Sequence, residues 1–124
     1  MEAEVALKLV RRSDQAVVAS NALLADTFWT RLKGLIGKKS LADGEGLLFP
    51  KCNDIHMWMM SISIDVLFLK KTDEQSWVIL KPVAQLKPWK VLPVACFKAD
   101  DTLELPVGII ERLNLKAGEV LCIA

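Results

Sequence analysis

Histidine, cysteine and tyrosine are scarce in this chain of 124 residues, which has one histidine, three cysteines and no tyrosine. The cysteines (Cys52, Cys96 and Cys122) are widely spaced and form no CxxC motif. Their odd number argues against a closed disulfide framework. We expect them to be free thiols that pack as small hydrophobic side chains, which indicates a reducing compartment only weakly. Carboxylates are therefore the residues that remain for any chemistry.

Long apolar runs and an excess of one charge are also absent. Unbroken apolar stretches such as Val66–Leu69 are far shorter than the about 20 residues of a membrane-spanning helix. No basic region precedes an apolar stretch at the start, so we expect a cytoplasmic protein as the chain stands, or an exported one if a leader was removed. The formal charge of +1 gives no general reason to expect nucleic acid as a partner.

What the chain does have is a globular composition, with 52% apolar and 25% charged residues. This composition excludes intrinsic disorder. The length predicts a single domain over residues 1–124, large enough to bury one core without disulfides or a metal.

Alternation of apolar and polar residues predicts several short strands. The clearest case is a long or broken strand from Ile55 to Lys70, in which every second residue from Met60 to Phe68 is apolar. Leu67 and Leu69 interrupt the polar face, so we expect both faces of the strand to be covered at its end. Further strands are predicted at 5–10, 16–19, 47–49, 77–80, 102–105 and 120–123.

Two short helices complete the predicted secondary structure. The first runs from an N-cap at Asp26 or Thr27 to Ile36, and the second from Pro106 to about Leu113. Pro82, Pro88 and Pro93 argue against a central strand or a helix in the stretch that these prolines interrupt. We therefore expect a mainly β protein, a compact single-domain β barrel or sandwich of short, mostly antiparallel strands with two short helices.

Five blocks of the sequence form a recognisable set of motifs: Arg31–Gly37, Gly46–Phe49, His56–Phe68, Lys87-Pro-Trp89 with Leu103–Gly108, and Leu115–Val120. Taken together they resemble the DUF192 family, a bacterial and archaeal domain family of unknown function. The likeness extends over about residues 20–123, and it departs at Ser63, where a proline is common. Many members carry a secretory or lipoprotein signal, which this chain does not show. The resemblance implies a small, mainly β barrel or sandwich and supplies no reaction.

His56 is the only imidazole, and its neighbours suggest three kinds of site. Cys52 and His56 have a spacing suited to two zinc ligands or to a nucleophile and its base, but no further ligand or orienting group follows at a defined spacing. Met57, Met59 and Met60 could suit Cu(I), yet strand alternation divides them between two faces. We therefore expect packing methionines, no metal and no cofactor.

Asp65 and Glu104 are single acids within apolar strands. Asp65 is expected either to face solvent or to be buried and bonded, to backbone amides or to a basic partner such as Arg31. The two carboxyls could form a general acid–base pair if they face each other. The sequence does not place them together.

Lysines with interleaved tryptophans occupy the stretch from Trp77 to Lys98. Basic and aromatic residues are typical of a single-strand nucleic-acid surface, but four lysines are a modest patch, so nucleic acid is an unlikely partner. Trp89, between Pro88 and Lys90, is the aromatic residue that we expect to be exposed and to form the wall of a groove.

These observations lead to three hypotheses. The first is a small non-catalytic binding or accessory module for an unknown small molecule or protein. Its groove would lie near the His56–Met60 strand and the Lys87–Trp89 loop, with Arg31, His56, Met60 and Trp89 as candidate ligand-binding residues. The second is a hydrolase-like enzyme that uses Asp65 and Glu104 with His56. The third is a structural or protein-interaction domain that pairs through an exposed strand.

Overall fold

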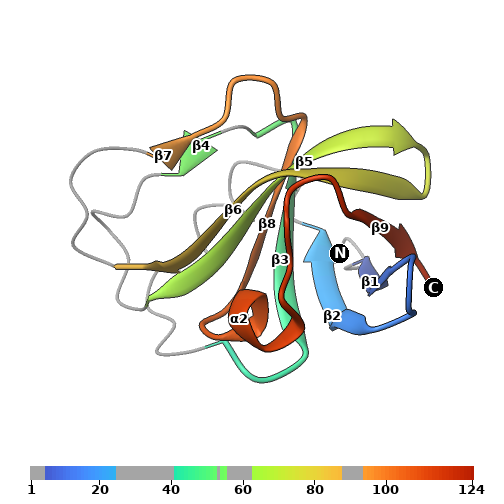
Figure 1. Ribbon diagram of the computed structural model, residues 1–124, viewed down its shortest axis with the longest axis horizontal. Helices are drawn as coiled ribbons and strands as arrows, with labels where there is room; N and C mark the ends of the chain where they lie inside the picture. Colours follow the sequence, from blue (N-terminus) through green and yellow to red (C-terminus); the bar gives the residue numbers. More distant parts are fainter. Residues whose placement is uncertain (1–4, 25–40, 53, 56–62, 88–93) are drawn as a thin grey trace, which may run out of the picture.

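The computed structural model describes residues 5–24, 41–52, 54–55, 63–87 and 94–124 (Figure 1). In these ranges the chain is mainly β, as predicted. The strands are β1 (Ala6–Arg11), β2 (Val17–Leu24), β3 (Glu45–Pro50), β4 (Asp54–Ile55), β5 (Ile64–Asp73), β6 (Ser76–Leu86), β7 (Val94–Ala95), β8 (Asp101–Pro106) and β9 (Val120–Ile123). The helix α2 (Ile109–Leu113) precedes β9.

Seven strands close into a barrel in the order β1-β2-β3-β8-β5-β6-β9, and β4 and β7 form a separate two-stranded sheet (Figure 1). The pairs are antiparallel except for β2 and β3. A parallel pair needs a long connection, and here residues 25–44 separate the two strands. The prediction of mostly antiparallel strands is confirmed.

The wall of the barrel is apolar on both faces. One cluster of buried side chains has members on all seven barrel strands, so it fills the interior; it includes Leu9, Val18, Leu48, Leu67, Ile79, Leu103 and Leu121. Ile109 and Ile110 of α2 join this interior cluster. A second cluster lies on the opposite face of the wall, and we call it the outer cluster; its buried members are Leu41, Leu47, Phe49, Ile64, Val66, Phe68, Leu86 and Ala99.

Strand β5 shows why both faces are apolar. Val66 and Phe68 belong to the outer cluster, whereas Leu67 and Leu69 belong to the interior one, and all four are 0% exposed. Alternate residues of a strand point to opposite faces, so a continuous apolar run is what a doubly covered strand requires. The expectation that Leu67 and Leu69 mark such a strand is confirmed.

Pro82 departs from the prediction, because it lies within β6 opposite Leu67. β6 pairs with β9 only through Ser76–Val78, so its second edge has no neighbour in the barrel at Pro82. Proline lacks the backbone N–H group. An unpaired strand edge forms no ladder hydrogen bonds, so a proline is tolerated there. Pro82 therefore does not end the strand, and Pro88 and Pro93 lie outside the described residues.

The predicted helices have different outcomes. The second is present as α2, but it begins at Ile109, because Pro106 belongs to β8 and Gly108 takes a left-handed conformation before the helix. The first, between Asp26 and Ile36, lies outside the described residues, as do residues 56–62 of the strand predicted from Ile55 to Lys70.

Candidate functional site

Asp65 is a buried carboxylate at one end of the barrel interior, and its hydrogen bonds connect separate parts of the backbone. Its side chain is 0% exposed, and it accepts three backbone N–H groups. Oδ1 accepts the N–H of Gln85 at 2.9 Å, while Oδ2 accepts those of Gly108 at 3.1 Å and Ile110 at 2.9 Å. The first N–H groups of a helix have no partner within it, so Asp65 supplies the acceptor that α2 lacks. The buried and bonded alternative is the one observed, with backbone amides as partners.

The bond from Gln85 also holds an irregularity of the sheet. Gln85 has a left-handed backbone conformation, with a φ of 56°, and the register between β5 and β6 shifts between Ile64 and Val66. A bulge leaves a backbone N–H without its ladder partner. The Asp65 carboxylate accepts this N–H, so one side chain joins β5, the bulge in β6 and the start of α2.

Asp101 performs a similar task near the opposite end of the same inner face. It accepts the indole N–H of Trp77 at 2.6 Å and the backbone N–H of Lys51 at 3.0 Å. Asp101 does not stand out in the sequence, because an Asp-Asp pair before a strand is typical of a solvated turn. The alternation of the strand does indicate its position, because Asp101, Leu103 and Leu105 are every second residue and so share one face.

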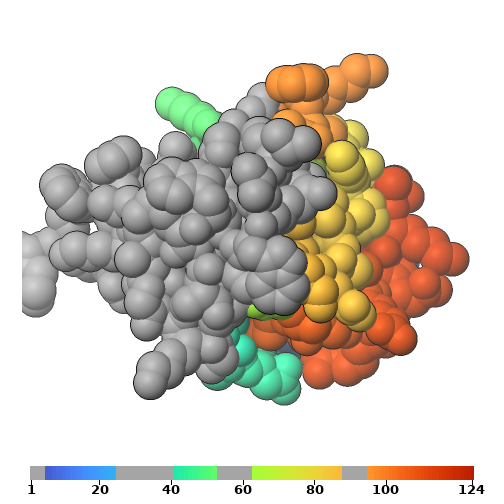
Figure 2. All heavy atoms as spheres, turned by 90° about the vertical axis from the view of Figure 1, so that its left-hand side faces the viewer, coloured from blue at the N-terminus to red at the C-terminus, as the bar shows by residue number. Residues whose placement is uncertain are grey.

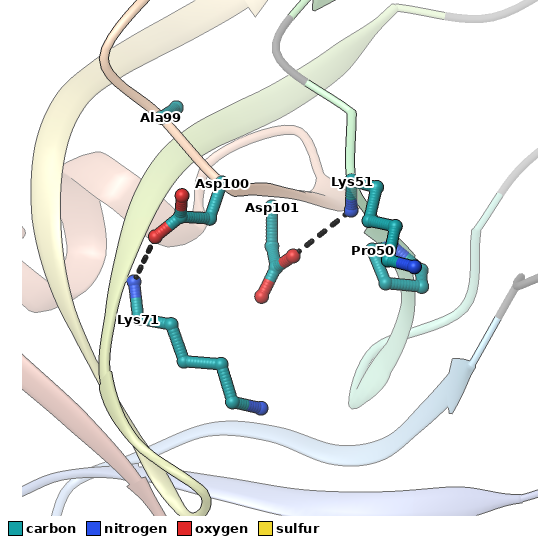
Figure 3. A pocket seen from close by; sticks show the side chains of 6 residues that line it. All are labelled: Pro50, Lys51, Lys71, Ala99, Asp100 and Asp101. Atoms are coloured by element: carbon teal, nitrogen blue, oxygen red, sulfur yellow. Dashed lines mark hydrogen bonds between the residues drawn. The ribbon is translucent and has the colours of Figure 1, made fainter.

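A pocket of about 620 Å³ lies beside Asp101 and is lined by Pro50, Lys51, Lys71, Ala99, Asp100 and Asp101 (Figure 3). Asp100 accepts the backbone N–H of Lys71 at 2.9 Å, and the Lys71 ammonium lies 4.9 Å from the centre of the Trp77 ring. Both carboxylates of the pocket are thus bonded to the fold. The pocket holds none of the residues that the sequence predicted as a site.

Glu104 lies on the other face of the wall. It stands opposite Val66 on β5 and opposite Leu47 on β3, and both of these belong to the outer cluster. Its side chain is buried, and Oε2 has no hydrogen-bond partner among the residues that the structure describes. Burial in this apolar layer raises the pKa of Glu104 to about 8. At neutral pH the group is therefore mostly a neutral carboxylic acid.

Asp65 and Glu104 do not share a pocket. Asp65 pairs with Leu105, an interior residue, whereas Glu104 pairs with Val66 of the outer cluster. Residues directly opposite in a sheet share a face, so the two carboxyls point to opposite sides of the barrel wall. Acid–base partners must reach one substrate, and this geometry does not let them.

The other candidate residues, Arg31, His56, Met60 and Trp89, lie outside the described residues. The chain segments that hold them nevertheless have described ends. Residues 56–62 lead from β4 to β5, residues 88–93 lead from β6 to β7, and residues 25–40 lead from β2 towards β3.

Trp77 is not available for stacking on a nucleic-acid base. It is 2% exposed and lies in the interior cluster. Lys81, one of the four lysines of the predicted patch, donates to the backbone oxygen of Ala95 at 3.2 Å. Across the described ranges, no group of three or more His, Cys, Asp or Glu side chains could hold a metal ion. In the same ranges, no helix has the length and apolar character to cross a bilayer.

The fold and the wall define a small closed β barrel with a second apolar layer on its outside. The family model of DUF192, described as "Uncharacterized ACR", matches residues 9–123, and the chain belongs to this family. A UPF0127 protein of Thermococcus sibiricus (strain DSM 12597 / MM 739) is 30% identical over 115 residues, which are 90% of this chain and 71% of that protein.

Two crystal structures resemble the barrel. One is a protein of unknown function from Novosphingobium aromaticivorans DSM 12444, with a TM-score of 0.75 and 24% identity, covering 95% of this chain and 84% of that one. The other is a Sinorhizobium meliloti 1021 protein described as a "putative transcription regulator", with a TM-score of 0.76 and 22% identity, covering 98% and 94%. At these identities the likeness shows the fold alone.

Proposed function

We propose that this protein is a small non-catalytic binding module, with a ligand groove over the outer cluster near the His56–Met60 and Lys87–Trp89 segments. One observation carries the proposal. The three segments that contain Arg31, His56, Met60 and Trp89 each begin or end within two residues of a member of the outer cluster. Residues 25–40 end before Leu41, residues 56–62 end near Ile64, and residues 88–93 begin shortly after Leu86.

Strand pairing supports the placement of two of these segments side by side. Residues 56–62 and 88–93 both connect the β4–β7 sheet to the β5–β6 pair. Ile55 pairs with Val94 at one end, and Ile64 pairs with Leu86 at the other. Two connections that are held together at both ends are suited to border one groove, and an apolar floor with few polar groups is typical of ligand sites.

The β4–β7 sheet is tied to the same face of the barrel. Cys52, just before β4, and Cys96, just after β7, both pack against the outer cluster. The turn after β7 protrudes from the molecule (Figure 2), and in it Phe97 is 89% exposed. The three cysteines form no disulfide, which suits the cytoplasmic location that we propose with this function.

The two alternatives have less support. The hydrolase hypothesis requires Asp65 and Glu104 in one pocket, and they lie on opposite faces of the wall. Pairing through an exposed strand requires a free edge. Among the described residues, closure of the barrel gives each of its strands two neighbours over part of its length. The open edges that remain are partial, as on β6 at Pro82, where the proline has no N–H to offer a partner strand. A binding role at the outer cluster requires neither a shared pocket for the two acids nor a free strand edge.

The test is a fragment screen on ¹⁵N-labelled protein, with small apolar and aromatic compounds and amide shifts as the readout. We expect shifts to gather at Ile55, Ile64, Leu86 and Val94. Trp89→Ala should weaken these hits, whereas Phe97→Ala, which removes an exposed aromatic residue outside the proposed groove, should not. Hits that gather at the pocket beside Asp101, or hits unaffected by Trp89→Ala, would contradict the proposal.

A second measurement separates binding from catalysis. The protein is incubated with p-nitrophenyl acetate and p-nitrophenyl phosphate, together with Asp65→Asn and Glu104→Gln. We expect no turnover above the buffer rate from any of the three proteins. Turnover that both substitutions abolish would restore the hydrolase hypothesis.

A further inference from the structure

Glu104 is a buried carboxyl on an apolar surface. The side chain is 3% exposed, its nearest cross-strand neighbours are Leu47 and Val66, and Oε2 lacks a hydrogen-bond partner among the described residues. Buried polar atoms in native proteins are bonded with few exceptions, and the exceptions mark places where another group is to be expected. An unpaired buried carboxyl also destabilises the fold, because ionising it without a partner is costly.

The charged groups on the same face do not supply that partner. Lys70 pairs with Asp100 at 3.4 Å, Lys81 donates to the Ala95 carbonyl, and the Glu45 carboxylate accepts the Ala42 N–H. The hydroxyl of Thr102 donates to the Cys52 carbonyl, and the other titratable groups that the described residues pack against this cluster are the Cys52 and Cys96 thiols. None of these described groups brings a positive charge to Glu104.

We propose that Glu104 is the anchor for a small organic ammonium ion, a primary amine on an apolar body, bound over the outer cluster. The carboxylate accepts the ammonium hydrogens, and Leu47, Val66 and their neighbours contact the apolar body. This deepens the proposed function and rests on it, because the ligand must reach the outer face through the groove proposed there. It adds the chemical class of the ligand and the residue that selects it.

Amine binding at Glu104 should depend on pH. Because burial raises the pKa of Glu104 to about 8, an arriving ammonium must displace the proton from the carboxyl. A simple alkylamine stays charged up to about pH 10. The affinity should therefore rise about tenfold between pH 7 and pH 9, as the carboxylate form becomes dominant.

The probes are 2-phenylethylamine and its neutral counterpart 2-phenylethanol, which differ in the charged group. Binding is followed through the methyl ¹H–¹³C signals of Leu47, Ile64 and Val66, which do not exchange with water at high pH. We expect the amine to shift these methyls, with the tenfold gain between pH 7 and pH 9, and the alcohol to bind more weakly without a pH dependence.

Two matched variants complete the test. Glu104→Gln keeps the size of the side chain and should weaken the amine at least about tenfold and remove its pH dependence, whereas Glu74→Gln, at an exposed turn, should change neither. Equal binding of amine and alcohol at these methyls, or full binding by Glu104→Gln, would overturn the ammonium proposal and leave the binding module intact. If neither probe shifts these methyls, both proposals fail.

Discussion

Asp65 on β5 and Ile110 in α2 are joined by a 2.9 Å hydrogen bond from the backbone N–H to the carboxylate, across 45 positions of the chain. The same carboxylate holds Gly108 and Gln85. The Asp65 carboxylate therefore accepts N–H groups at the start of α2 and also the N–H group of the bulge in β6. This relationship gives Asp65 a structural role, and the first prediction tests it.

Asp65→Asn should destabilise the protein strongly. The asparagine keeps one acceptor oxygen, but its NH₂ group faces at least one backbone N–H that it cannot satisfy. We expect a loss of about 3 kcal/mol in the free energy of unfolding, measured by urea denaturation. Asp43→Asn, at an exposed turn residue, is the control and should change this free energy by less than about 0.5 kcal/mol. An unchanged midpoint for Asp65→Asn would contradict the structural role.

Glu104 should make the protein less stable as the pH rises. The folded-state pKa is about 8 and the ordinary value is 4.5, so between these values the folded protein holds a proton that the unfolded chain has released. Stability is therefore highest below about pH 4.5 for this group, falls through the window, and levels off above pH 8. The full effect is on the order of 5 kcal/mol.

The measurement is urea denaturation at pH 5, 6.5 and 8 for the natural protein and for Glu104→Gln. We expect the difference in unfolding free energy between the two to shift steadily in favour of the variant as the pH rises. Glu74→Gln should follow the natural protein throughout. A constant difference over this range would show that Glu104 ionises in the folded protein at its ordinary pKa.

Trp77 and Asp101 should be energetically coupled. The indole N–H donates to Asp101 at 2.6 Å within the barrel, so Trp77→Phe leaves a buried carboxylate oxygen without that donor. A double-mutant cycle with Asp101→Ala, which removes the acceptor, should give a coupling energy of about 1–3 kcal/mol in thermal or urea unfolding. Additive losses from the two substitutions would mean that the bond contributes nothing measurable.

Gly44 and Gly118 should respond differently to alanine. Both have positive φ, of 86° and 93°, so each substitution strains the backbone. At Gly44 an added Cβ would also lie 2.5 Å from the Ser20 hydroxyl oxygen, whereas nothing lies within 4 Å at Gly118. We expect Gly118→Ala to cost about 1 kcal/mol and Gly44→Ala more, by circular-dichroism melting. Restoring space with Ser20→Ala should recover part of the extra loss at Gly44.

The strands were largely predictable, because their signal is local. Alternation from Ile64 to Phe68 and the unbroken apolar run to Leu69 together predict a strand covered on both faces, and both clusters are found there. The errors also have local causes. Pro82 argues against a central strand in the sequence, because the sequence does not reveal which edge of β6 lacks a neighbour.

The site was predictable only in part. A single acid among apolar neighbours singled out Asp65 and Glu104, and both are buried. Asp101 and its bond to Trp77 were missed, because 24 positions separate the two residues and no local pattern joins them. Arg31, His56, Met60 and Trp89 remain predictions, supported by where their segments begin and end.

The sequence by itself determined the family, the β character and the doubly covered strand, because composition, motifs and alternation are properties of the chain. Only the tertiary structure decided which way each acid points. β5 and β8 pair so that Asp65 stands opposite Leu105 and Glu104 opposite Val66. A shift by one residue would have exchanged their faces, and register is set by the closure of the whole barrel.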